Sequence, residues 1–182
     1  MFRIHSTLLV LALLTAVEAQ VYHSCPAHPE GEYENPLYDQ WLSAFDVKHY
    51  HLTLEVSNTE THIEGVAEVV IEATRDMDTL VLELQDDLEV TAVETIPAGT
   101  SLDYGHFNQA IYIKLDRSYH TGELCRVKIS YGGDAGNDRG FFAGINSKKD
   151  SNYGFDVTYT LSEPHNAKDW FPVKQVLEDK ID

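Results

Sequence analysis

The sequence predicts an all-β fold, an antiparallel β-sandwich or saddle. Apolar and polar residues alternate with a period of two in several short runs, as expected for strands with one buried face. Turn-forming Gly, Pro, Asn and Asp separate these runs. No run before residue 165 predicts a helix, and neither a βαβ order nor a phosphate-binding glycine loop is present. Short strands joined by polar turns are typical of antiparallel sandwiches.

The first strand is predicted from Phe45 to Val56. Its apolar face carries Tyr50, Leu52, Leu54 and Val56, and its polar face carries His49, His51, Thr53 and Glu55. Further strands are predicted at 63–73, 80–84 and 88–96, and, after a turn at 97–99, at 110–115 and 124–131. The glycine-rich segment 132–144 predicts a loop, and 153–161 predicts the last strand.

Residues 1–19 are typical of a secretory signal peptide. Arg3 precedes an apolar run at 8–14, and small residues end the segment at Ala19. The run is too short to span a bilayer, so no membrane anchor is predicted. We expect an extracellular or periplasmic protein that begins at Gln20. An extended, Pro- and Gly-interrupted lead-in at 20–43 would precede one β-domain at 44–182.

The charge balance excludes nucleic acid as a partner. The chain has 30 acidic residues against 13 Lys and Arg, a formal net charge of −17, and phosphate binding needs clustered cations. The acidity predicts a well-solvated surface. The two cysteines, Cys25 and Cys125, allow one disulfide in an exported protein, or two unrelated thiols.

The other groups of potential metal ligands or catalytic residues predict neither a metal site nor an active site. His49 and His51 share one strand face, and the lead-in contains His23, Cys25 and His28, but neither group completes a metal site. We therefore predict no metal ligands in this chain. Glu83, Asp86 and Asp87 follow a strand and predict a solvated turn. No serine has a histidine partner at a recognisable spacing.

The most specific string is T-L-S-E-P-H-N-A-K-D-W-F-P, from Thr160 to Pro172. From the residues alone it is a strand end, a turn at Pro164 and an aromatic pair that could close the core. The string also resembles T-Q-x-E-P-x-x-A-R-x-x-F-P-C, which closes the N-terminal domain of aminopeptidase N-type zinc metallopeptidases, the gluzincin aminopeptidases. Four earlier strings agree in order: V-K-H-Y-x-L-x-L, I-E-G-V-A-E-V-V-I, L-V-L-E-L and I-S-Y-G-G.

Departures from the family pattern are Leu161 for Gln, Lys168 for Arg, Val173 for Cys and Gln175 for Asp. The closing K-Q-V-L-E-D-K-I-D resembles a secreted bacterial branch of the family. The resemblance implies that Glu163, which the chain retains, binds the free α-amino group of a peptide substrate. It also leads us to expect that Trp170 and Phe171 form an exposed ledge facing a catalytic domain.

The resemblance further implies that the zinc-binding H-E-x-x-H and the substrate-binding G-x-M-E-N belong to a thermolysin-like catalytic domain. Neither string occurs in this sequence. We therefore expect a truncated or split product: a non-catalytic accessory domain that holds no cofactor and partners a catalytic domain or a separate chain. The alternative is a stand-alone extracellular β-sandwich that serves as a binding or interaction module.

Overall fold

The computed structural model describes residues 36–136, 144–162 and 165–176, all within one compact unit, Glu34–Asp182. A separate unit, Met1–Tyr33, lies outside the described residues. The predicted signal peptide, most of the lead-in, Cys25 and Glu163 are therefore not described.

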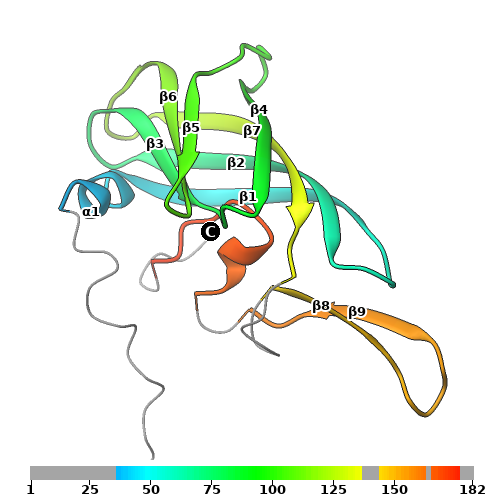
Figure 1. The fold of residues 1–182 in the computed structure, drawn as a ribbon. Helices are drawn as coiled ribbons and strands as arrows, with labels where there is room; N and C mark the ends of the chain where they lie inside the picture. The colour runs from blue at the N-terminus through cyan, green and yellow to red at the C-terminus, as the bar shows by residue number, and fades with distance from the viewer. Residues whose placement is uncertain (1–35, 137–143, 163–164, 177–182) are drawn as a thin grey trace, which may run out of the picture. The chain divides into compact units, whose positions relative to one another are not determined.

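The larger sheet has four antiparallel strands in the order β1-β2-β7-β4 (Figure 1). These are β1 (Phe45–Val56), β2 (His62–Ala73), β7 (Leu124–Asp134) and β4 (Leu88–Thr95). In β2 every second residue from Ile63 to Ala73 is buried, and the residues between them are exposed or half-buried. This burial confirms the period-two prediction, because alternate side chains of a strand point to opposite faces.

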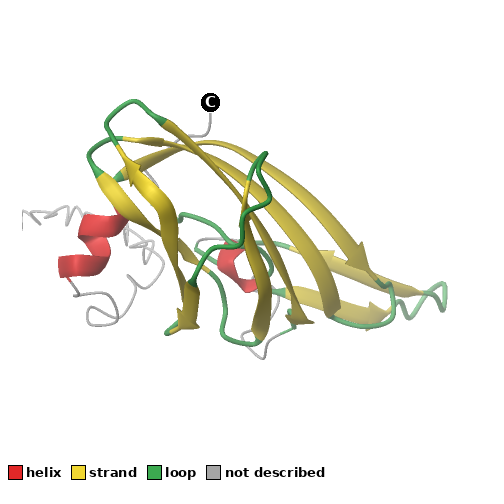
Figure 2. Cartoon of the chain, turned by 90° about the horizontal axis from the view of Figure 1, so that it is seen from above, coloured by secondary structure: helices red, strands yellow, loops and turns green. Residues whose placement is uncertain are grey.

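The second sheet has three antiparallel strands in the order β3-β6-β5. Its strands are β3 (Met77–Glu83), β6 (Ala110–Tyr119) and β5 (Tyr104–Phe107). Figure 2 shows the strands of the domain from above. Both sheets contribute to one hydrophobic core, which includes Leu80, Leu82, Ile111 and Ile113 from the smaller sheet and Val69, Ile71, Val127 and Ile129 from the larger one. The fold is thus the predicted antiparallel, sandwich-like β-domain.

A short helix, α1 (Pro36–Leu42), packs on the outer side of the smaller sheet. Its Trp41 ring meets the Tyr112 ring edge-on at 5.5 Å, and Tyr112 is the cross-strand partner of the buried Val81. This cover explains why Val81 is buried although its strand neighbours face the core. The expectation that residues 20–43 are extended is therefore wrong for Pro36–Leu42.

The remaining strands form a hairpin, β8 (Ile145–Lys149) and β9 (Asp156–Thr160). The Asn58 side chain donates to the Asp156 carbonyl at 3.3 Å, which places the β1–β2 turn beside the hairpin. The 3₁₀ helix η1 (Ala167–Asp169) follows β9. The predicted last strand at 153–161 is thus shorter, and residues 132–134 of the predicted loop belong to β7.

Cys125 is a buried, free thiol on β7, whereas Cys25, the other cysteine of the permitted disulfide, lies outside the described residues. Burial raises the pKa of this thiol. None of the helices in the described ranges has the length and apolar character needed to cross a membrane.

Candidate functional site

The closing segment, residues 160–175, carries the family-like string and is described except for Glu163 and Pro164. Its last part pairs with the end of β3. The Glu83 amide donates to the Val173 carbonyl at 2.7 Å, and the Val173 amide donates back to the Glu83 carbonyl at 2.9 Å. The Gln175 amide donates to Glu83 Oε2 at 2.9 Å. Glu83 is only 7% exposed, so the prediction that it lies in a solvated turn is wrong, whereas Asp86 and Asp87 are exposed as predicted.

The 3₁₀ helix within this segment is held by Gln85, which lies in the connection between β3 and β4. The Gln85 amide donates to the Lys168 carbonyl at 2.9 Å, and Gln85 Nε2 reaches Asp169 Oδ1 at 3.4 Å. The other carboxylate oxygen of Asp169 accepts from the Gly144 amide at 3.0 Å. Asp169 is 1% exposed, and these hydrogen bonds offset the cost of burying its carboxyl group.

Glu83 and Gln85 therefore hold the closing segment. Leu84 and Asp86, which alternate with them along the chain, hold the β5–β6 turn. The Leu84 amide donates to the Gln109 carbonyl at 3.0 Å, and the Gln109 amide donates to Asp86 Oδ1 at 2.8 Å. Residues 83–86 thus connect two loops that are far apart in the sequence. The sequence pattern missed this role, because it shows alternation but not which loop will cover the polar side of a strand.

Trp170 and Phe171 are half-buried and pack against the core, which corrects the expected exposed ledge. The two rings lie 4.5 Å apart between centroids, and Phe171 meets Tyr50 edge-on at 5.8 Å. Trp170 Nε1 donates to Ser162 Oγ at 2.7 Å, and the Tyr131 hydroxyl donates to the Trp170 carbonyl at 3.1 Å. Ser162, which directly precedes the undescribed pair 163–164, is thus tied to Trp170, and Tyr131 of the larger sheet holds Trp170 in turn.

An apolar groove of about 490 Å³ lies beside this segment, between the end of β1 and the β8–β9 hairpin. Its lining includes Leu54, Val56, Ile145, Thr160 and Trp170. Val56 is exposed although it is a large apolar residue on a strand. Two lining residues, Thr160 and Trp170, belong to the closing segment, while Glu163, the residue that the resemblance assigns to substrate binding, lies outside the described residues.

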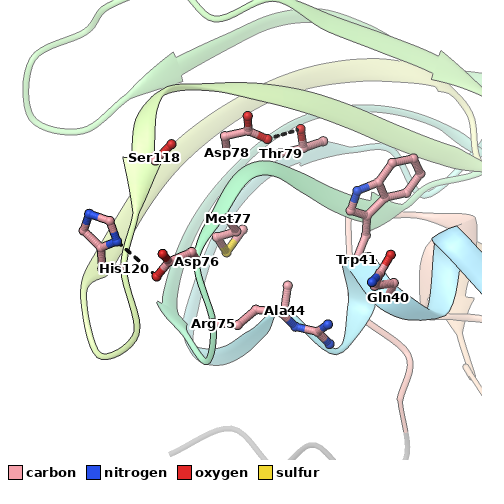
Figure 3. Close-up of a pocket in the computed structure, with 10 residues that line it drawn as sticks. All are labelled: Gln40, Trp41, Ala44, Arg75, Asp76, Met77, Asp78, Thr79, Ser118 and His120. Atoms are coloured by element: carbon pink, nitrogen blue, oxygen red, sulfur yellow. Dashed lines mark hydrogen bonds and ion pairs between the residues drawn. The ribbon is translucent and has the colours of Figure 1, made fainter.

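A second pocket, of about 400 Å³, lies where α1 meets the β2–β3 and β6–β7 turns (Figure 3). Its charged groups pair with one another or with neighbours at the surface. His120 Nδ1 lies 3.0 Å from Asp76 Oδ1, and Lys114 Nζ lies 2.6 Å from Asp78 Oδ2. The hydrogen bond from Lys114 lowers the pKa of Asp78. Because its ion pairs are exposed and mutually satisfied, this pocket is a weak candidate for a binding site.

No three His, Cys, Asp or Glu side chains group to hold a metal ion within residues 36–136, 144–162 and 165–176. His49 and His51 lie on the outer face of the larger sheet and are exposed.

Residues 46–174 match the Peptidase M1 N-terminal domain. The chain belongs to this family. Its fold is similar to that of a variant M1 zinc metallopeptidase from Deinococcus radiodurans bound to a Tyr-Ser-Ala substrate, with 25% identity and a TM-score of 0.57, over 72% of this chain and 29% of that chain.

Two further M1 structures show the same likeness. The M1 zinc metallopeptidase from Deinococcus radiodurans is similar in fold, with 23% identity, a TM-score of 0.58, and 72% and 29% of the two chains covered. A two-domain M1 zinc metallopeptidase variant bound to L-tryptophan has 25% identity and a TM-score of 0.57, over 72% and 30% of the chains. This M1 N-terminal domain thus spans less than a third of these peptidases. No curated protein matches the chain.

Proposed function

We propose that this chain is the accessory N-terminal domain of an exported M1 zinc metallopeptidase. In this proposal residues 1–19 direct export, residues 44–182 form the accessory domain, and Glu163 binds the free amino terminus of a peptide substrate. Hydrolysis would depend on a thermolysin-like catalytic domain, in the same chain or a separate one. The accessory domain would select substrates and would not cleave them alone.

The observation that carries this proposal is the anchoring of the closing segment on both sides of Glu163. Ser162 is held by Trp170, and the part from Lys168 to Gln175 is held by Glu83 and Gln85. In this proposal the anchored segment would present the Glu163 carboxylate to the substrate, and a partly desolvated carboxylate pairs strongly with an ammonium group. The ligands of the M1 relatives, a Tyr-Ser-Ala substrate, L-arginine and L-tryptophan, have the α-amino chemistry that such a carboxylate would select.

This proposal assigns no step of hydrolysis to the domain, because the zinc-binding H-E-x-x-H string of the family does not occur in its sequence. In the proposed assembly the zinc and the general base would both belong to the catalytic domain. The contribution of this domain would be recognition of one end of the substrate, which a peptidase needs in order to distinguish a free α-ammonium from an internal amide.

A comparison of two proteins tests the proposal: residues 20–182 alone, and the same residues with a matching M1 catalytic domain, fused or added as a separate chain. Alone, the domain should retain no stoichiometric zinc and should not cleave an aminoacyl reporter. With the catalytic domain it should support cleavage of the reporter with a free amino group but not of its N-acetylated form. One tightly held zinc per chain, with chelator-sensitive cleavage by residues 20–182 alone, would contradict the accessory role.

A second candidate function, a stand-alone extracellular interaction module, is favoured by the tip of the β8–β9 hairpin. Tyr153 is 80% exposed and Phe155 is 55% exposed, and their rings stack with centroids 5.9 Å apart. Exposed paired aromatics are typical of protein interfaces. Replacing both with Ser separates the two functions. An interaction module would lose its partner, whereas recognition of the substrate amino terminus by the accessory domain would persist.

A further inference from the structure

We propose that Tyr131 is a positioning residue for the closing segment. Its hydroxyl fixes the Trp170 backbone, and the Trp170 indole in turn fixes Ser162, the residue that precedes Glu163 in the chain. The consequence for substrate binding rests on the proposed function, whereas the consequence for Trp170 and Ser162 does not.

The Tyr131 ring reaches the closing segment because Gly65 leaves room for it. These residues are directly opposite each other on β7 and β2. A β-carbon at position 65 would lie 2.4 Å from the Tyr131 Cζ atom, far inside van der Waals contact. Tyr131 is 1% exposed, and burial raises the pKa of its phenol. The hydroxyl consequently remains a neutral donor over the physiological pH range.

Trp170 in turn contacts the first part of the closing segment, where β9 ends. The Trp170 carbonyl accepts from Tyr131 at 3.1 Å, and its Nε1–H donates to Ser162 Oγ at 2.7 Å. Thr160 Oγ1, two residues earlier, donates to the Gly144 carbonyl at 2.8 Å. Two side-chain bonds thus fix the chain just before Glu163, and one of them depends on where Tyr131 places Trp170.

Tyr131→Phe tests this relay, because it removes one hydroxyl and keeps the ring in place. Tyr119→Phe is the matched control: Tyr119 is also buried, and its hydroxyl donates to Asp116 Oδ1 at 3.0 Å, away from the closing segment. The chain has two tryptophans, Trp41 and Trp170, so the protein labelled with ¹⁵N gives two indole N–H signals. Trp41→Phe assigns them.

In residues 20–182 we expect Tyr131→Phe to shift the Trp170 indole signal and to speed its hydrogen exchange roughly three- to ten-fold, as for the loss of one hydrogen bond. The Trp41 signal should stay unchanged, and Tyr119→Phe should leave both signals in place. Ser162→Ala should change the Trp170 signal in a similar way. The positioning role is overturned if Tyr131→Phe leaves Trp170 unchanged, or if Tyr119→Phe changes it as much.

The same variants, combined with a matching catalytic domain, test the consequence for substrate. Tyr131→Phe should raise KM for an aminoacyl reporter and lower kcat/KM roughly three- to ten-fold, while Tyr119→Phe should change neither. If Glu163→Ala lowers kcat/KM and Tyr131→Phe does not, the proposed link to substrate is wrong. If Glu163→Ala has no effect, the proposed function fails, and the indole signals still decide whether Tyr131 positions Trp170 and Ser162.

Discussion

Gly65 and Tyr131 are cross-strand partners whose side chains share one space: the Tyr131 ring occupies the position that a β-carbon on residue 65 would need. The β-carbon would lie 2.4 Å from Cζ and 2.7 Å from the hydroxyl oxygen of Tyr131, whose side chain is buried. The pair therefore couples a glycine in the interior of a strand to the placement of the closing segment, through the hydrogen bond from Tyr131 to Trp170.

Gly65→Ala should destabilise the domain by about 1 to 3 kcal/mol, because the added methyl group forces the Tyr131 ring or the backbone to move. Urea unfolding of residues 20–182 measures this loss. A double-mutant cycle with Tyr131→Leu provides the control, since removal of the ring should relieve most of the cost. An equal cost of Gly65→Ala in both backgrounds would mean that strand conformation, and not the Tyr131 ring, requires the glycine.

Glu83→Ala should also cost about 1 to 3 kcal/mol of unfolding free energy, because it leaves the Gln175 amide without its acceptor in a region shielded from water. Glu83→Gln keeps an acceptor oxygen and should cost less. Asp87→Ala removes an exposed acid four residues away and should stay within about 0.5 kcal/mol of the wild type. Equal stabilities for the Glu83→Ala and Asp87→Ala variants would contradict the anchoring role.

The stability of the domain should fall at alkaline pH. Burial raises the pKa of both Tyr131 and Tyr119, while a tyrosine in the unfolded chain ionises near pH 10, at about its reference pKa. The stabilising contribution is complete below about pH 10 and is lost as the pH rises toward the folded-state pKa values, because the unfolded chain releases its phenol protons first. Urea unfolding at intervals from pH 8 to pH 11 measures the decline.

Tyr131→Phe should make this alkaline decline shallower, because it removes one of the two buried phenols. Tyr153→Phe removes an exposed phenol on the β8–β9 hairpin and should follow the wild type. A decline that is unchanged in Tyr131→Phe would show that other groups govern the alkaline stability.

Glu163→Ala should lower kcat/KM by a factor of roughly 30 to 1,000, about 2 to 4 kcal/mol, when the domain is combined with a matching catalytic domain. The reason is the loss of one partner of a desolvated charge pair with the substrate ammonium. Leu161 stands where the family pattern has Gln, so under the proposed function Glu163 would carry more of the recognition. In residues 20–182 alone the same change should leave the unfolding free energy nearly unchanged.

Glu60→Ala, which removes an exposed acid in the β1–β2 turn, is the matched control and should leave kcat/KM at the wild-type value. Unchanged kinetics in Glu163→Ala, or unfolding of the isolated domain on that substitution, would identify Glu163 as a structural residue.

The sequence by itself determined the fold class and most of the strands. In β1, β2, β4, β6 and β7 the alternation of apolar and polar residues matches the strands that form, because a strand with one buried face imposes that pattern locally. The family resemblance, carried by the string at 160–172, is confirmed over residues 46–174.

Only the tertiary structure decided which polar residues are buried and which short segments become strands. β5 has four residues, and β8, of sequence INSKK, has little apolar character, so each is a strand through its pairing with β6 or β9. Glu83 follows the pattern of an exposed residue, but it is covered by Gln175, 92 positions along the chain. Alternation along a strand distinguishes its two faces, whereas burial of the polar face depends on which distant segment packs there, and no local pattern contains that information.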